Sequence, residues 1–445
     1  MLRFWLVGFS GVACVLTGCI DVSFSEGTGT TTTGTGGATT ATTSIGGGST
    51  DDSTTSTSTS GAGGSGGGAP MPDCTNKRCG PDGIGGLCNG KPMAATWSVN
   101  LSSGVRAIVP WPETQSLLVT MSQDHAARID ECDGSVMAEN PTVSASAGDN
   151  RPYLMAAGLY DGQLMILGAS SWAGANPDRR YYLDASSPDL ALASSETLNN
   201  GWGKAAGYGF ADPTGLYVAQ ATGAVGFLPP AAPVCSSSYG SFSGFTARGI
   251  LRTPTAVYTA NVGSAFPTLV VGKLLSVCPE ACNCQGSTTR SLANNVIYND
   301  LVDSGVDVIG AGTSANTRAR LGHLDPMTLN ESNVLDVDSG ASSGNSTLLT
   351  AAVAGSFVYA GGARTLSDAD AYARDPQGGV AVLYRVPTAF DSNTTADVVV
   401  LTGGARVREV LGDANGIYAG GTKADEASGF LAKCTAALDC DPLPP

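Results

Sequence analysis

The sequence predicts an all-β fold built from repeated units, and three observations indicate it. The chain of 445 residues has 60 glycines and 42% hydrophobic residues but only 7% aromatic and 14% charged residues, a composition typical of turn-rich β structure. From residue 93 onward, short apolar runs alternate with Gly, Asn and Asp turns, as they do in antiparallel strands. These runs recur seven times at a period near 50 residues, which suits one four-stranded blade per repeat. We therefore predict a β-propeller with seven blades of about four antiparallel strands each.

Residues 1–18 predict a signal peptide for export. Arg3 precedes an apolar stretch, and Leu-Thr-Gly stands directly before Cys19, which is the arrangement of a lipoprotein signal. A transmembrane helix is the alternative, but it needs about 20 apolar residues and this run is shorter. We expect Cys19 to be lipidated with fatty acids such as palmitate. Ile20 follows, whereas the inner-membrane retention signal of enterobacteria has Asp at that place, so we expect anchoring in the outer membrane.

Residues 19–72 predict a disordered stalk. Between residues 27 and 69, every residue except Ile45, Asp51 and Asp52 is Gly, Ser, Thr or Ala, so this segment cannot bury a core. As a flexible coil it has a root-mean-square reach of about 35 Å, enough to hold a domain clear of a lipid surface. O-glycosylation of its Thr clusters is the alternative to an unmodified spacer.

Residues 73–92 predict a small cysteine-rich module. Cys74, Cys79 and Cys88 lie among Gly, Pro and Asp with almost no apolar residue to form a core, so only crosslinks could order the segment. Disulfides are the interpretation we favour, and a zinc site is the alternative. The string resembles a short Cys-Gly-Pro-Asp-Gly-Cys-Gly-Gly module found after the stalks of some bacterial surface lipoproteins. Ile84 stands where that pattern has a cysteine, which leaves the internal pairing open.

Residues 93–445 contain the repeats. The clearest copy, at residues 405–433, has a strand of alternating residues, a Gly/Asn/Asp turn, a second strand, a polar loop and a third strand. Weaker candidates for outer strands lie at residues 333–337 and 396–401. The positions that mark the middle strand of each copy are spaced by 41 to 59 residues: Leu118, Met165, Tyr217, Tyr258, Val308, Tyr359 and Tyr418.

The last repeat lacks a fourth strand in its own sequence, because few residues follow it. Residues 95–101 alternate as a strand does and precede the first repeat, so we expect them to complete the last blade and close a ring, which removes exposed sheet edges. The small residues of the middle strands lead us to place those strands near the central axis. An open β-solenoid or a pair of sandwiches is the rival architecture, although solenoid repeats are usually shorter.

Two strings in the repeats carry a family resemblance. VYAGG at residues 358–362, and GIYAGGT at residues 416–422 followed by GFLAK, look like the repeats of seven-bladed β-propellers from secreted and surface bacterial proteins. The resemblance covers about four fifths of the chain. It implies the same propeller fold that the period predicts.

The cysteines of the repeats also recur. Cys278 and Cys284 have the same separation after a third strand as Cys434 and Cys440, which predicts two short loops closed by disulfides, each worth about 2 kcal/mol. Six further cysteines have no assigned partner: Cys74, Cys79, Cys88, Cys132, Cys235 and Cys282. The Cys278 to Cys284 run could instead hold a metal, but no fourth ligand is near it in sequence.

No reactive constellation is recognisable, and we expect no catalytic residue, cofactor or metal site. His125 and His323 are the only histidines, and neither lies in a metalloprotease motif, so we expect both to be structural. Aspartates also gather in two clusters, and neither cluster fits the EF-hand pattern. We interpret them as solvated acids in loops, with a weak calcium site as the alternative. The clusters are Asp300, Asp303 and Asp307, and Asp368, Asp370 and Asp375.

The sequence favours a lipid-anchored, non-catalytic propeller that serves as a binding platform at the cell envelope. A net charge of −15 argues against nucleic acid as a partner, so we expect an unknown protein or glycan ligand, and membrane contact through the lipid anchor only. An enzyme acting on glycan or another envelope polymer through loop-borne carboxylates is one alternative. A structural spacer or adhesin is the other.

Overall fold

The computed structural model describes most of the chain from residue 74 onward. The residues that it does not describe are 1–73, 76, 85, 146–152, 170–178, 199–204, 221–223, 231–238, 242–244, 264–268, 275–286, 292–295, 339–343 and 374. The predicted signal peptide, Cys19 and the stalk therefore lie outside the described residues, as do Cys235, Cys278, Cys282 and Cys284. In the part of the chain that is described, no helix has the length and apolar character needed to span a membrane.

The described strands pair into seven antiparallel four-stranded sheets. The first strands are β2 (Val105–Trp111), β6 (Tyr153–Tyr160), β10 (Ala205–Asp212), β14 (Phe245–Arg252), β18 (Ile297–Asp303), β22 (Asn345–Ala354) and β26 (Gly404–Asp413). The second strands are β3 (Ser116–Met121), β7 (Gln163–Ala169), β11 (Gly215–Gln220), β15 (Val257–Gly263), β19 (Val308–Thr313), β23 (Phe357–Leu366) and β27 (Gly416–Lys423).

The outer half of each sheet consists of shorter strands. The third strands are β4 (Ala126–Asp130), β8 (Arg179–Asp184), β12 (Ala224–Leu228), β16 (Leu269–Leu274), β20 (Ala319–Leu324), β24 (Val380–Pro387) and β28 (Gly429–Cys434). The fourth strands are β5 (Val136–Asn140), β9 (Leu192–Thr197), β13 (Tyr239–Ser241), β17 (Ser287–Ser291), β21 (Glu331–Asp336), β25 (Asp397–Val400) and, for the sheet of β26, β1 (Trp97–Leu101). The helical turns are Cys88–Gly90, Pro112–Thr114 and α1 (Asp368–Ala371).

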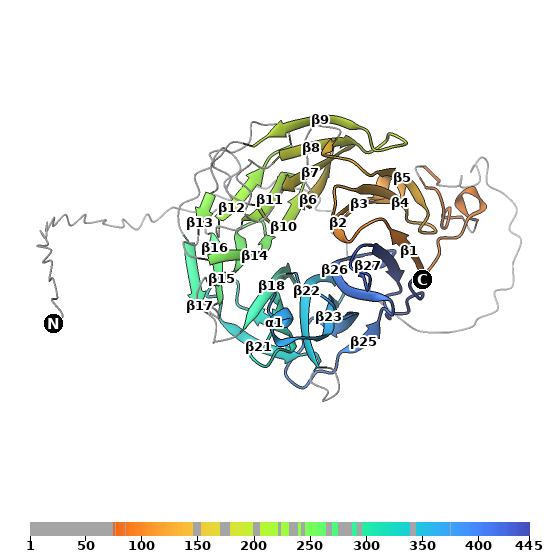
Figure 1. The fold of residues 1–445 in the computed structure, drawn as a ribbon. Helices are drawn as coiled ribbons and strands as arrows, with labels where there is room; N and C mark the ends of the chain where they lie inside the picture. Colours follow the sequence, from red (N-terminus) through yellow and green to blue (C-terminus); the bar gives the residue numbers. More distant parts are fainter. Residues whose placement is uncertain are drawn as a thin grey trace, which may run out of the picture. The chain divides into compact units, whose positions relative to one another are not determined.

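The sheets follow one another around a common centre (Figure 1). The first strand of each sheet packs on the first strand of the next, from β2 through β6, β10, β14, β18 and β22 to β26, and β26 packs in turn on β2. The prediction of an all-β propeller is therefore confirmed. All seven marker positions of the repeats lie on second strands, so the repeat was correctly phased from its turn residues.

The first strand of the chain lies in the same sheet as the last. β1 pairs antiparallel with β28, so that Trp97 faces Lys433 and Asn100 faces Phe430 across the ladder. Figure 1 shows the orange N-terminal strands beside the blue strands β26 and β27. The pairing covers the edge that β28 would otherwise expose.

The prediction that the middle strands lie nearest the axis is wrong. The first strands face the centre, and the small residues of the second strands receive the neighbouring blade instead. A Cβ atom on Gly361 of β23 would lie 2.4 Å from Val407 of β26, and one on Gly420 of β27 would lie 2.6 Å from Val105 of β2. Glycine at these places lets adjacent blades pack closely.

A buried polar cluster lies at the junction between the last sheet and the first. Glu131, which follows β4, is 3% exposed, and its Oε1 accepts hydrogen bonds from Tyr418 Oη and Asn415 Nδ2, both at 2.6 Å. Its backbone carbonyl accepts a bond from Trp97 Nε1 at 3.1 Å. One buried glutamate thus links three strands from both ends of the propeller.

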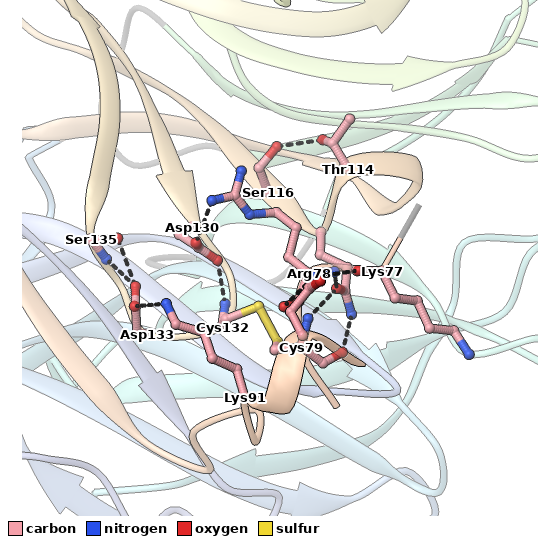
Figure 2. Close-up of polar contacts among 12 residues, drawn as sticks. Lys77, Arg78, Cys79, Lys91, Thr114, Ser116, Asp130, Cys132, Asp133 and Ser135 are labelled. Atoms are coloured by element: carbon pink, nitrogen blue, oxygen red, sulfur yellow. Dashed lines mark hydrogen bonds and ion pairs between the residues drawn. A yellow bond between two sulfur atoms is a disulfide. The ribbon is translucent and has the colours of Figure 1, made fainter. Parts of the chain in front are cut away.

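The cysteine-rich module is fastened to this same junction (Figure 2). Cys79 forms a disulfide with Cys132, the residue after Glu131, and Cys74 forms one with Cys88. Arg78 Nη2 lies 3.2 Å from Asp130 Oδ2, and the Gln115 side chain bonds to the backbone of Cys79 in both directions. Cys434 and Cys440 form a third disulfide.

The loop lengths of two disulfides give a stability prediction. Cys79 and Cys132 are 53 residues apart and Cys434 and Cys440 are 6 apart. On the chain-entropy estimate, the longer loop stabilises by about 4 kcal/mol and the shorter by about 2 kcal/mol. We expect the double variant Cys79→Ser/Cys132→Ser to lose about twice as much free energy of unfolding in urea as the control variant Cys434→Ser/Cys440→Ser. Equal losses would show that the module does not brace the junction.

Candidate functional site

Every first strand carries an irregularity in its register with the second strand. Each shift leaves one or two residues of the first strand unpaired with the second, and it falls between Val105 and Ala107, Leu154 and Ala156, Ala205 and Tyr208, Ala247 and Gly249, Tyr298 and Asp300, Leu348 and Thr350, and Val407 and Glu409. A β-bulge turns a side chain away from the pleat and is common beside binding sites. Residues at or shortly after each shift line one cavity at the centre of the propeller.

This cavity has a volume of about 340 Å³ and is lined by residues of all seven first strands. Most of its lining is small or apolar, such as Ala107, Ala156 and Ile250. The charged side chains that line it are Arg106, Asp300, Arg408 and Glu409. The centre of the propeller therefore holds an apolar cavity with a few convergent charged groups, which is the usual composition of a ligand site.

Asp300 lies on the wall of this cavity and is bonded to the backbone of two strands. Its Oδ1 accepts from the N–H of Leu301 at 2.8 Å, and its Oδ2 accepts from the N–H of Ala351 on β22, also at 2.8 Å. Burial raises the pKa of Asp300 to about 6, while these backbone bonds and one from the Thr350 side chain act in the opposite direction. Thr350 Oγ1 in turn accepts from the N–H of Val410 at 3.2 Å.

Glu409 is the second carboxyl group on the wall. Burial, and then the charge of Asp300, raise the pKa of Glu409 well above its usual range. The Glu409 side chain is partly accessible because it borders the cavity. The cavity is itself surrounded by protein, so the carboxyl group is still shielded from bulk solvent. Two carboxyl groups with raised pKa values in one cavity are candidates for proton-transfer chemistry.

Three arginines converge at the edge of the cavity on one carboxylate. Arg106 Nη2 lies 3.3 Å from Asp375 Oδ2, Arg406 Nη2 lies 3.3 Å from Asp375 Oδ1, and Arg408 also contacts Asp375 Oδ1. The side chains of Arg406 and Arg408 are each 5% exposed, so these guanidinium groups are shielded from bulk water. Arg406 also pairs with Glu426, whose Oε1 lies 2.7 Å from Arg406 Nη1.

Asp375 belongs to an insertion that we call the strap, defined as residues 367–373 and 375–379. Thirteen residues separate β23 from β24, whereas five separate β19 from β20 and β27 from β28. The strap begins at Ser367, whose Oγ accepts from the N–H of Asp370 at 3.1 Å and caps α1. α1 lies against β22 and β23 (Figure 1).

The strap crosses from its own sheet to four others. Ala371 O accepts from Thr313 Oγ1 of β19 at 3.0 Å, and Tyr372 O accepts from Arg248 Nη2 of β14 at 3.0 Å. Asp375 then reaches Arg106 of β2 and the two arginines of β26. It borders a second cavity of about 210 Å³, which Arg106, Asp375, Arg406 and Glu426 line together.

The carboxylates singled out in the sequence have different environments. The interpretation of Asp300 as a solvated loop acid is wrong, because Asp300 lies on the wall of the central cavity. Asp375 is partly exposed and pairs with arginines. Asp303 is exposed at the end of β18. Asp368 and Asp370 lie in α1.

Both histidines make structural contacts. His125 Nδ1 lies 2.6 Å from Ser102 Oγ, and His323 Nδ1 lies 3.2 Å from Asp307 Oδ2 while its ring packs on Phe390. Among the residues with a described position, no group of three or more His, Cys, Asp or Glu side chains is arranged to hold a metal ion. The arginines Arg106, Arg406 and Arg408 were not recognised from the sequence.

Comparison with protein-family models and with curated proteins finds no match for this chain. Among solved structures, BamB from Moraxella catarrhalis aligns with 12% identity and a TM-score of 0.42, over 76% of this chain and 86% of its own. The computationally designed Ika8 protein aligns with 8% identity and a TM-score of 0.45, over 76% and 98%. The WD40 β-propeller domain of Doa1 aligns with 11% identity and a TM-score of 0.49, over 76% and 97%.

The raised pKa of Asp300 predicts a pH dependence of stability. A folded-state pKa near 6, against an ordinary value of 3.8, means that the folded protein binds this proton more tightly than the unfolded chain does. The contribution of the Asp300 carboxyl group to the free energy of unfolding is therefore present in full below about pH 4 and is lost as the pH rises through about 6. The change is on the order of 3 kcal/mol.

We expect the difference in free energy of unfolding between wild type and Asp300→Asn to change by this amount between pH 4 and pH 7, measured by urea titration at each pH. Asp303→Asn, which removes an exposed carboxylate of the same strand, is the control and should show little change. A difference for Asp300→Asn that is constant with pH would contradict the assignment.

Proposed function

We propose that the protein is an exported, lipid-anchored β-propeller that acts as a binding platform at the cell envelope, with its ligand site at the centre of the ring. The signal peptide, Cys19 and the Gly/Ser/Thr stalk support anchoring in the outer membrane through palmitate or other acyl chains. The net charge of −15 disfavours nucleic acid as the partner.

The observation that carries the binding role is the convergence of Arg106, Arg406 and Arg408 beside a cavity that all seven first strands line. Shielded guanidinium groups interact strongly with anionic groups because water does not screen them. A rigid ring presents such groups at fixed positions. This arrangement suits a selective binding site for a protein or glycan.

We further propose that seven blades close into one ring through the pairing of β1 with β28. The contact of β26 with β2 supports this closure. Closure matters for the binding role because Arg406 and Arg408 lie on β26 and Arg106 lies on β2.

The anchoring proposal is tested with Cys19→Ser in the native host. We expect the wild type to incorporate a palmitate analogue and to sediment with the outer membrane, and the variant to be unlabelled and absent from that fraction, since the variant lacks the thiol that is acylated. Labelling that persists in Cys19→Ser would contradict the assignment of this residue.

The binding role is tested by screening the full-length protein against arrays of envelope glycans and peptides. We expect a ligand to be retained unchanged and to be lost in Arg408→Gln, whereas the matched control Arg385→Gln, whose arginine pairs with Asp397 far from the cavity wall, keeps it. Retention that does not depend on Arg408, or no retention of any ligand, contradicts the proposal.

A second function is favoured by the carboxyl pair of Asp300 and Glu409. A buried carboxyl group whose pKa is raised can act as a general acid, so hydrolysis of an envelope glycan or polymer is the alternative. In the same screen this function would appear as cleavage of the retained ligand, abolished in Glu409→Gln and kept in Asp303→Asn.

A further inference from the structure

We propose that the three arginines form a binding site for an acidic peptide and that Asp375 of the strap occupies this site as an internal competitor. The proposal deepens the proposed binding role, since it names the ligand class and the way in which access is controlled. It rests on the geometry of the strap and of the arginines.

The charges around Asp375 show that this site requires an anion. Three guanidinium groups face Asp375 and Glu426, and two of the three are 5% exposed. Loss of Asp375 would leave Arg406 with Glu426 but would remove the carboxylate that Arg106 and Arg408 contact, which is unfavourable for guanidinium groups that are largely shielded from water. If Asp375 leaves, another anion must take its place, and a carboxylate fits because a carboxylate on a peptide is what the site now holds.

The geometry of the contact favours a carboxylate presented by a chain. Asp375 uses both oxygens, Oδ2 toward Arg106 and Oδ1 toward Arg406 and Arg408, so the carboxylate lies between two sheets. The neighbouring peptide groups of the strap are also recognised: Gly378 N donates to Glu426 Oε1 at 2.8 Å, and Tyr372 O accepts from Arg248. The groups around the strap therefore contact both the Asp375 carboxylate and the peptide backbone on either side of it.

The contacts that hold the strap are mainly polar. Of its side chains, Ala371 and Pro376 are buried, Ala371 in a small cluster with Ala363 and Leu366, and Tyr372 is half-buried against a core cluster of the neighbouring sheets. Segments with few buried apolar contacts open at low free energy compared with the core. The strap can therefore leave the arginines while the sheets stay folded, provided that a competing anion compensates their charge.

The lengths of the connections between second and third strands indicate that the strap is an addition to the fold. Five residues suffice to join the second and third strands in the sheets of β18 and β26, whereas the sheet of β22 uses thirteen. A connection of five residues would not need to cross to other sheets. The additional length is what brings Asp375 to arginines that belong to β2 and β26.

The test uses a fluorescent, N-acetylated peptide with the sequence of residues 370–378 as the probe, and full-length protein. We expect Asp375→Asn to bind this peptide at least about tenfold more tightly than wild type, because removing the internal competitor raises the fraction of open sites. A peptide with Asn in place of its second Asp should not bind. Adding Arg408→Gln to Asp375→Asn should abolish binding, whereas adding Arg385→Gln should not.

A matched control and a measurement on the wild type keep the test decisive. Asp391→Asn removes an exposed turn carboxylate and should bind the peptide as weakly as wild type does. If Asp375→Asn does not fold, saturating peptide should still accelerate hydrogen exchange of the amides of Ala371 and Gly378 in the wild type, since it displaces the strap. Equal binding by wild type and Asp375→Asn, or unchanged exchange at those amides, overturns the proposal.

The outcome is separable from that of the proposed binding role. An envelope ligand that depends on Arg408 but does not compete with the acidic peptide would overturn the inference about ligand class and leave the binding role standing. If Asp375→Asn binds the peptide but no envelope ligand is retained on any array, the inference about ligand class would stand and the proposed binding role would be overturned.

Discussion

The pairing of β1 with β28 is the interaction on which the rest of this structure depends. It brings residues that are more than three hundred positions apart into one ladder, with Trp97 opposite Lys433. Each sheet buries its first strand against the next sheet, so the first and last sheets need each other to cover their exposed faces. Glu131 and the Cys79–Cys132 disulfide reinforce the same junction from the side of the first sheet.

The candidate site is a consequence of this junction. Arg106 follows the start of β2 and Arg406 and Arg408 lie near the start of β26, so these arginines meet only when the last sheet packs on the first. The strap reaches the same place from the sheet of β22. The bulges around the centre turn residues of the first strands toward one cavity, which explains how a fold with few charged residues assembles a charged site.

The repeat was accessible from the sequence because turn residues and alternation recur locally in every copy, and even the weak outer strand at residues 396–401 contains β25 (Asp397–Val400). The residues that meet at the centre of the propeller could not be predicted from the sequence. Asp300 fits no calcium-binding pattern in the chain and was interpreted as solvated, whereas its partner Ala351 comes from another sheet. The alternation of Arg406 and Arg408 was a local signal for one shared face, but nothing local pointed to Asp375 or to Cys132 as distant partners.

The central proposal is that β1, which pairs with β28, is an integral part of the propeller and closes it. Native-state hydrogen exchange on the full-length protein tests this most directly, because amides that are lost only in global unfolding all report the same free energy. The amides of β1 and β28 should exchange with the free energy measured for β26 and β27. Exchange of β1 through a separate opening of much lower free energy, while β26 and β27 keep full protection, would contradict the claim.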